Sequence, residues 1–459
     1  MLQQAPPFLY VAVAYRGQAM SEQTNHTAEK PASYRYVVLA MLILAYTFNF
    51  LDRQILGILA KPIKEEFGLT DAQFGLMGGL AFALLYTTLA IPIAWLADRF
   101  SRVWIMTAAL TLWSGFTALC GFVGSFSHLF LARMGVGIGE AGGVAPAYSL
   151  ISDYFPKHQR ARALAAYAFG IPLGTAAGTL VGGLLAVHYG WRTAFIVVGL
   201  LGVLLAPLFR LVVRDPPRGG ADRVLDAPPV PPAPAAPLGQ VVKLLAVKPS
   251  FWLLALGAAS SSVCGYGVAA WLPSFFMRSL GLTLAQTAWY YSGIAFLGGV
   301  IGIWMGGVMA DRLGAKSKAG YPLTPAVAFL ISVPCFLLAM NSGSLVGGFG
   351  GQASLALAFV IFLVPTGLNL AWLGPITAAV QHLAPAPMRT TTSALFLLIN
   401  NLLGIAVGVY YFGAVSDLLK PTFGAESLRW AIYTGMGFYL LAALLFFLAS
   451  RRLERDWVD

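Results

Sequence analysis

Residues 46–53 read Tyr46-Thr-Phe-Asn49-Phe-Leu-Asp52-Arg53, and they place two charges inside the first long apolar run of the chain. The run covers residues 36–60, about the length that a membrane-spanning helix needs. A charge at the centre of a bilayer costs about 2.5–3.5 kcal/mol on insertion scales. Adjacent residues point about 100° apart on a helix, so Asp52 and Arg53 cannot simply neutralise each other. We therefore expect each to find another partner or a ligand.

The composition is that of a membrane protein. Hydrophobic residues make up 58% of the 459 residues and charged residues only 10%, whereas soluble domains carry about 25% charged residues. The mean hydropathy is +0.75. Six long apolar runs precede a proline-rich break at residues 213–249, and six follow it. The sequence therefore predicts an all-α membrane protein with twelve transmembrane helices in two six-helix bundles.

The polar segments divide the chain into five parts. The predicted parts are a disordered tail (1–34), a first bundle (35–212), an extended linker (213–249), a second bundle (250–450) and a short tail (451–459). Lys and Arg gather in the tails, the linker and every second loop, which predicts that both termini are cytoplasmic in a plasma (inner) membrane. This placement explains the formal net charge of +11 without nucleic acid as a partner.

Several classes of site are not indicated. The three cysteines, Cys120, Cys264 and Cys335, lie inside apolar runs and form no CxxC motif, so neither a disulfide framework nor a metal site is expected. None of the five histidines pairs with Cys, Asp or Glu at ligand spacing, and no nucleotide-binding loop is present. We expect that the protein is not an enzyme and that it uses no metal and no cofactor. A proton gradient is the expected source of energy for its activity.

The second and eighth apolar runs end alike. They read Ala94-Trp-Leu-Ala-Asp98-Arg99-Phe-Ser-Arg102 and Gly307-Val-Met-Ala-Asp311-Arg312-Leu-Gly-Ala-Lys316. A pattern that recurs at the same place in each half indicates duplicated halves. It resembles the signature loop of the major facilitator superfamily, G-x-x-x-D-R-x-G-R-R, although the first copy departs from it at Ala94, Ser101 and Val103 and the second at Ala315.

The resemblance implies a gating role for these turns. The expected gating residues are Asp98, Arg99, Arg102, Asp311 and Arg312. Asp98 is expected near the start of the eleventh helix, where the free amides of residues 390–392 favour an anion.

The fourth apolar run holds the other charges deep in a span. It reads Arg133-Met-Gly-Val-Gly137-Ile-Gly139-Glu140, and its first, fifth and eighth residues share one helix face. We interpret Gly137 as leaving room for Arg133 to lie toward Glu140. The stretch resembles the fourth-helix motif of the superfamily, R-x-x-x-G-x-G-x-A, which does not require the acid.

A charged cluster is expected in the first bundle. At 1.5 Å of helix rise per residue, Asp52 lies at a depth in the membrane between those of Glu140 and Arg133. If the first and fourth helices are neighbours, as they are in the superfamily, these three residues form one cluster with Arg53. Buried acids in a membrane are functional by default, which makes Asp52, Glu140 and Arg133 candidates for proton coupling. The alternative is a static ion network that holds the bundle together.

Substrate contacts are expected from both halves. Arg53, Asn49 and Tyr46 share one helix stripe that suits a phosphate or another anionic head. The second half has no acid deep in a span, and its polar candidates are Tyr266, Tyr290, Asn369, Trp372 and Asn400. Packing is the alternative role for each of these five.

Two glycine stripes indicate close helix contacts. Gly170, Gly174, Gly178 and Gly182 recur every four residues in the fifth run, as Gly298, Gly302 and Gly306 do in the eighth. They face each other across the boundary between the halves, as these helices do in the superfamily, or they pack inside each half.

Three stretches together resemble the Spinster branch of the superfamily. They are Asn49-Phe-Leu-Asp52-Arg53, Gly137-Ile-Gly139-Glu140-Ala-Gly-Gly and Asp153-Tyr-Phe-Pro-Lys-His-Gln-Arg160-Ala-Arg162-Ala. The resemblance implies a secondary active transporter, proton-coupled and working by alternating access. Its implied substrate is an amphipathic lipid such as sphingosine-1-phosphate or a lysophospholipid, and we expect a monomer. The alternatives are a carrier for another organic anion, sugar or drug, and a membrane receptor that does not transport.

Overall fold

The computed structural model describes residues 33–217, 237–314, 316–342, 352–385 and 388–458. These residues form long helices, and no strand occurs among them. The predicted tail up to residue 32 and most of the predicted linker, residues 218–236, lie outside the described residues.

The helices of the N-terminal half make six passes. They are α2 (Tyr34–Ile58); α4 (Asp71–Leu76), η1 (Met77–Ala81) and α5 (Phe82–Ala97); α6 (Arg102–Cys120); α7 (Phe126–Glu140) with α8 (Val144–Tyr154); α9 (Lys157–Ala168) with α10 (Gly170–Tyr189); and α11 (Trp191–Val212). The short helix α3 (Ala60–Phe67) connects the first pass to the second.

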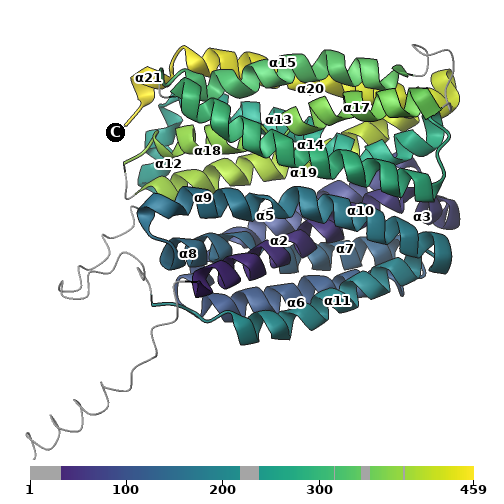
Figure 1. Cartoon of the computed structure of the whole chain (residues 1–459), viewed down its shortest axis with the longest axis horizontal. Helices are drawn as coiled ribbons and strands as arrows, with labels where there is room; N and C mark the ends of the chain where they lie inside the picture. The colour runs from purple at the N-terminus through teal and green to yellow at the C-terminus, as the bar shows by residue number, and fades with distance from the viewer. Residues whose placement is uncertain (1–32, 218–236, 315, 343–351, 386–387, 459) are drawn as a thin grey trace, which may run out of the picture.

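The C-terminal half repeats this count. Its passes are α13 (Pro249–Ser279), α14 (Leu284–Gly314), α15 (Gly320–Met340), α17 (Gln352–Leu368) with α18 (Leu373–Gln381), α19 (Arg389–Phe423) and α20 (Ser427–Ser450). The short elements are α12 (Leu238–Ala246), η4 (Gly424–Glu426) and α21 (Leu453–Asp456). The described helices thus make the twelve predicted passes, and the halves lie side by side as the purple-to-teal and green-to-yellow layers of Figure 1.

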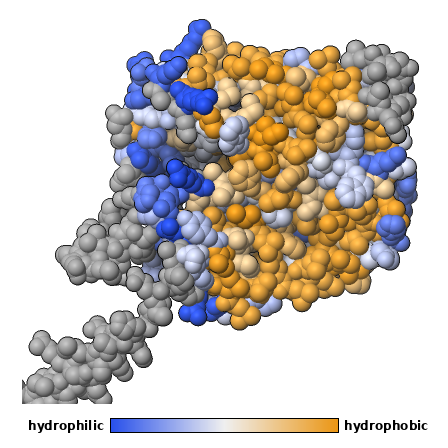
Figure 2. All heavy atoms as spheres, viewed as in Figure 1, coloured by the Kyte–Doolittle hydropathy of each residue, from blue (hydrophilic) through white to orange (hydrophobic). Residues whose placement is uncertain are grey.

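The outer surface matches a bilayer. Nine stretches of the described residues are long and apolar enough to cross a membrane, and two of them, His158–Val212 and Thr391–Ser450, each contain two passes. The pass made by α7 and α8 is interrupted at residues 141–143. Figure 2 shows a broad apolar band with hydrophilic residues gathered at its two ends. The predicted fold class is confirmed.

One part of the predicted linker is helical. Helix α12 lies inside residues 213–249, and its Val241 and Leu245 side chains are buried. The prediction of an extended linker is therefore wrong for residues 238–246, because two apolar residues four apart give this short helix a face to bury.

The glycine stripes pack inside each half. A Cβ at Gly174 or Gly178 of α10 would lie 2.3 or 2.6 Å from a backbone oxygen of α2. A Cβ at Gly302 of α14 would lie 1.9 Å from the carbonyl oxygen of Gly367 in α17. The boundary between the halves uses neighbouring positions instead, since Gly183 faces Ala288 and Gly299 faces Pro172.

A polar cluster joins the halves on one face of the molecule. We call the face that holds Tyr34 and the C-terminus the terminal face, and the opposite one the distal face (Figure 1). On the distal face the Asp71 carboxylate, at the start of α4, accepts hydrogen bonds from Lys64, from the Arg278 guanidinium of α13 (2.6 and 2.7 Å) and from the Ser416 hydroxyl of α19 (2.7 Å).

The same cluster also caps α4. The Asp417 carboxylate of α19 accepts hydrogen bonds from the backbone amides of Asp71 (3.1 Å) and Ala72 (2.6 Å), where the positive end of a helix favours an anion. We call Lys64, Asp71, Arg278, Ser416 and Asp417 the distal clamp. It holds the two halves together on the distal face.

The C-terminal residues form a strap across the terminal face of the second half. The Trp457 ring stacks on the His382 ring at 4.3 Å and on the Tyr321 ring at 5.7 Å. The Asp456 carboxylate accepts the Ser250 amide at 3.1 Å and so caps α13. The Lys248 ammonium donates to the Asp456 carbonyl at 2.7 Å. The predicted tail at 451–459 is therefore folded onto the bundle as far as residue 458.

Asp71→Asn is expected to loosen the distal clamp. The amide keeps the shape of the carboxylate but loses the charge that binds Arg278 and Lys64, and hydrogen bonds to charged groups contribute about 1.5–3 kcal/mol each. We expect at least about a tenfold rise in the labelling rate of a cysteine placed beneath the clamp. Glu426→Gln is the matched control, because Glu426 pairs with Arg429 inside one half on the same face. Equal labelling rates in both variants would contradict the clamp.

Trp457→Ala is expected to destabilise the C-terminal half. It removes the aromatic stack on His382 and Tyr321, and loss of about 1–2 kcal/mol lowers the melting temperature by about 2–8 °C. Thermal unfolding of the purified protein measures this change. Trp289→Ala is the control, since the Trp289 side chain is 61% exposed. A melting temperature equal to that of the control would show that the strap adds no stability.

Candidate functional site

An ion pair buried between α2 and α7 forms the centre of the site. The Arg53 Nε and Nη2 atoms both lie 2.7 Å from Oε2 of Glu140. The Glu140 side chain is fully buried, and 11% of the Arg53 side chain is exposed. The expectation that Arg53 finds a partner on another helix is confirmed. Removing either member of the pair leaves an uncompensated charge. That charge is costly because the apolar medium solvates it only weakly.

Asp52 and Arg133 complete the cluster but do not pair through their side chains. Asp52 is fully buried, and Arg133 donates a hydrogen bond to the Asp52 backbone carbonyl at 3.3 Å. Neither Asp52 carboxyl oxygen has a hydrogen-bond partner among the described residues. Its neighbours are the Thr117 hydroxyl and the Trp113 indole NH, whose polar atoms are likewise unpaired. The predicted cluster of four charged residues is present.

Gly137 packs closely against a neighbouring helix. A Cβ there would lie 2.6 Å from the Phe82 carbonyl oxygen of α5. A Cβ at Gly139 would lie 2.4 Å from the backbone nitrogen of Trp113 in α6. Gly137 therefore has a packing role, and the interpretation that it also makes room for Arg133 stays a prediction. The glycines let α7 approach α5 and α6, and this close packing sets the height of Glu140 opposite Arg53.

Aromatic rings surround the Arg53 guanidinium. Its central carbon lies 5.0 Å from the ring centre of Phe50, 4.8 Å from Phe82 and 4.8 Å from Tyr86. A cation close to aromatic faces gains about 0.5–2 kcal/mol per ring, more where water is excluded. The rings therefore help to hold the Arg53 guanidinium in place.

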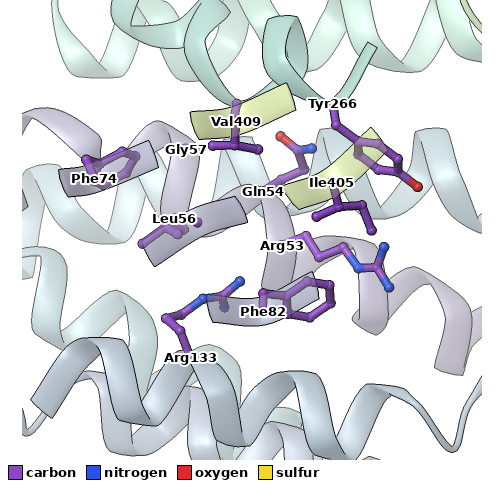
Figure 3. A pocket seen from close by; sticks show the side chains of 12 residues that line it. Arg53, Gln54, Leu56, Gly57, Phe74, Phe82, Arg133, Tyr266, Ile405 and Val409 are labelled. Atoms are coloured by element: carbon purple, nitrogen blue, oxygen red, sulfur yellow. The ribbon is translucent and has the colours of Figure 1, made fainter. Parts of the chain in front are cut away.

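A small pocket lies between the halves beside this cluster. Its lining includes Arg53, Phe82 and Arg133 from the first half and Tyr266, Ile405 and Val409 from the second. Figure 3 shows Tyr266 and Ile405 on the side of the pocket across from Phe82 and Arg133, with Arg53 between them. Its volume of about 40 Å³ is room for a few water molecules at about 10–15 Å³ each.

The other two candidates from α2 lie beside the pocket rather than in its lining. The Tyr46 ring stacks on Tyr167 at 4.3 Å and meets Phe50 edge-on at 5.2 Å. Asn49 is 2% exposed, lies next to Glu140, and its side-chain oxygen has no hydrogen-bond partner in the described part of the chain. The structure therefore brings Arg53 alone of this stripe to the pocket wall.

Of the five candidates in the second half, Tyr266 alone lines this pocket. The others bond within their own half: Tyr290 donates to the Leu355 carbonyl, Asn369 accepts from the Tyr439 hydroxyl at 2.8 Å, Trp372 meets Phe396 edge-on at 6.3 Å, and Asn400 accepts from the Ser262 hydroxyl at 2.8 Å. Asn369 lies between α17 and α18, so its bond to α20 fixes the break in that pass.

Sequence reasoning missed part of the pocket lining. Gln54, Phe82, Ile405 and Val409 line it. Gln54 directly follows the Asp52-Arg53 pair, so its polarity inside an apolar run is a usable signal. The other three residues are apolar residues in apolar runs, which carry no signal of their own.

The predicted gating residues fall into two groups. Asp98, Arg99 and Arg312 are exposed at helix ends, and Arg99 lies over the Trp95 ring at 3.6 Å. The Asp98 carboxylate makes no hydrogen bond or ion pair with the described residues, so the expected contact with the start of α19 is not made in this conformation. Asp311 belongs to α14, but its side chain lies outside the described part.

Arg102 is the buried member of the predicted gate. It is 2% exposed and pairs with Asp153 of α8 and, at 2.9 Å, with Asp215 at the start of the linker. It also donates to the Pro216 carbonyl at 2.8 Å. Arg102 therefore fastens the linker to the terminal face of the first half.

Comparison with known proteins agrees with this architecture. The sequence profile of the Major Facilitator Superfamily matches residues 42–409. An MFS-type efflux pump of Mycolicibacterium smegmatis is 32% identical over 95% of this chain and 97% of its own length. Protein spinster homolog 1 of Homo sapiens is 30% identical over 91% of this chain and 82% of its own length.

Solved structures give the same result. The crystal structure of a bacterial homologue of the human lysosomal transporter Spinster, inward-facing and unoccupied, matches with a TM-score of 0.79 and 30% identity, over 94% of this chain and 100% of that chain. The occupied inward-facing form matches with a TM-score of 0.75. With its twelve passes and its central buried charges, the chain therefore belongs to the major facilitator superfamily, as a spinster-like membrane transporter and not an enzyme.

Proposed function

We propose that the protein is a proton-coupled secondary transporter of amphipathic lipids with an anionic head, such as sphingosine-1-phosphate or a lysophospholipid. One observation carries this proposal: Arg53 lines the pocket between the halves while it pairs with the buried Glu140. A single guanidinium is thus shared between a titratable carboxylate and the space where a ligand would lie. A guanidinium binds phosphate through two parallel hydrogen bonds.

Competition for Arg53 links the proton to the substrate. When Glu140 is ionised, it neutralises Arg53 and leaves little attraction for an anionic head. When Glu140 takes up a proton, the ion pair is lost, and Arg53 needs another anion because an unpaired charge in an apolar medium is costly. Proton uptake by Glu140 and binding of an anionic head at Arg53 therefore favour each other.

Asp52 is the proposed second proton site. Its carboxyl is fully buried without a hydrogen-bond partner among the described residues, and Arg133 binds its backbone carbonyl instead. The balance between the charged and the neutral form of such a carboxyl depends on how close a cation lies. Movement of Arg133 toward the carboxyl would favour release of its proton, which couples Asp52 to a change in the packing of α2 on α7.

The two faces suggest how access alternates. The distal clamp is closed. On the terminal face, the Asp98 carboxylate has no partner among the described residues. We propose that the terminal face is cytoplasmic in a plasma (inner) membrane, with both termini inside, and that closure there uses Asp98, Arg99, Arg102, Asp311 and Arg312. A monomer is sufficient, because both halves of the pocket come from one chain.

Efflux of another amphipathic compound is the second candidate function. The similarity to the MFS-type efflux pump of Mycolicibacterium smegmatis favours it. Proteoliposome uptake of a panel of lipids, organic anions, sugars and drugs, with and without a pH gradient, decides between the two. Transport of drugs but not of any lipid would overturn the lipid proposal, and binding without transport would indicate a receptor.

Glu140→Gln is expected to uncouple transport from the pH gradient. The amide mimics the protonated acid, so Arg53 is free to bind an anionic head and lipid binding persists. Uptake driven by a pH gradient in proteoliposomes should fall at least about tenfold, the range for losing a group that moves a proton. Glu66→Gln is the control, since Glu66 lies outside the membrane and pairs with Arg192 at 2.6 Å. Unchanged pH dependence in Glu140→Gln would contradict the assignment.

Arg53→Lys is expected to discriminate between lipid heads. Lysine keeps the charge but loses the two parallel hydrogen bonds, so a phosphate-bearing lipid should bind about tenfold more weakly or worse. A neutral lipid of equal tail length should bind almost as before. Binding of both lipids to purified protein measures the difference. Equal losses for the two lipids would show that Arg53 is only an internal strut for Glu140.

A further inference from the structure

A second cavity opens on the distal face, away from the Arg53 pocket. Its volume is about 190 Å³, and it is lined by Lys64 and Asp71 from the first half and by Arg278, Lys420 and Ser427 from the second. Gly424 and Ala425, both exposed, lie between α19 and α20 at its rim. The cavity is thus formed by both halves and is accessible from the distal solvent.

Positive charge exceeds negative charge in the cavity lining. Three of the lining side chains are cations, Lys64, Arg278 and Lys420, and one is a carboxylate, Asp71. Asp71 already binds two of these cations. Lys420 is exposed and makes no ion pair with the described residues. With the Asp417 carboxylate of the distal clamp also counted, three cations face two carboxylates, so one positive charge, that of Lys420, remains to attract an anion.

The helix end at the cavity adds no free donor. Ser427 is the first residue of α20 and lines the cavity, but its backbone amide donates to the Gly424 carbonyl and its hydroxyl lies 3.2 Å from the Ser416 hydroxyl. The acid nearest to this end, Glu426, pairs with Arg429 at 2.9 Å. The attraction for an anion therefore comes from the cationic side chains.

We propose that this distal cavity is an anion-binding vestibule that takes a phosphate or carboxylate group at Lys420, beside Arg278 and Lys64. Lys420 supplies the cation that has no ion-pair partner among the described residues, and Arg278, whose Nη1 and Nη2 atoms bind Asp71, adds positive charge next to it. The bound group is either the head of a lipid or a free anion from the distal solvent. The site does not depend on the function proposed for the Arg53 pocket.

Phosphate binding to the purified full-length protein tests this site. Inorganic phosphate is titrated calorimetrically at constant ionic strength into wild type, Lys420→Gln and Lys61→Gln. Lys61 is the matched control, because it is an exposed distal-face lysine whose partner is Glu65 at 4.0 Å and it does not line the cavity. We expect Lys420→Gln to weaken phosphate binding about threefold to fivefold, as for one exposed charge pair, and Lys61→Gln to leave it unchanged.

Two further titrations identify the source of the anion and the place where it binds. A soluble lysophosphatidate that also binds more weakly to Lys420→Gln identifies a lipid head as a ligand, whereas a loss confined to inorganic phosphate identifies a free anion; both results support the vestibule. Arg53→Lys serves as the reference for the central pocket. Phosphate binding that falls in Arg53→Lys but not in Lys420→Gln, or that is absent in wild type, would overturn the proposal.

Discussion

In the Arg53–Glu140 ion pair, each buried charge depends mainly on its partner for compensation. In water an exposed pair of this kind contributes at most about 1 kcal/mol, but in a membrane interior each charge depends on its partner. The packing around the pair follows from this constraint. Glycines at positions 137 and 139 bring α7 against α5 and α6, and three aromatic rings enclose the guanidinium. Any event that changes the charge of Glu140 must therefore be answered by Arg53.

The fold could be read from the sequence because the membrane imposes a simple rule. Apolar runs of sufficient length, separated by polar turns, predict helices and their number without knowledge of their contacts. The Asp98 and Asp311 turns predict two related halves because the same pattern recurs at the same place in each half. Helix α12 was missed because its nine residues lie in a segment dominated by proline. The strap at Trp457 was missed because stacking on His382 is a contact between distant residues that no local pattern encodes.

The site was predictable only where its residues are unusual for their surroundings. Charges such as Asp52, Arg53 and Glu140 stand out in an apolar run, and the structure brings them together. Neutral residues gave no such contrast. Asn369, Asn400 and Tyr290 suit packing at least as well as ligand contact, and the structure pairs each with a neighbour in its own half. Which helix face a glycine stripe uses also depends on rotation about the helix axis, which spacing alone does not fix.

Each half is closed by a contact between residues near its start and residues later in the chain, and these contacts are completed at different times during synthesis. In the first half the Tyr34 hydroxyl donates to the Val212 carbonyl at 2.7 Å, so its first and last helices can be joined once residue 212 has left the ribosome's exit tunnel. In the second half the start of α13 is capped by Asp456, 206 residues later. Because synthesis runs from the N-terminus, the first half can complete its packing while the ribosome is still at work. The second half can do so only after residue 456 has left the ribosome's exit tunnel.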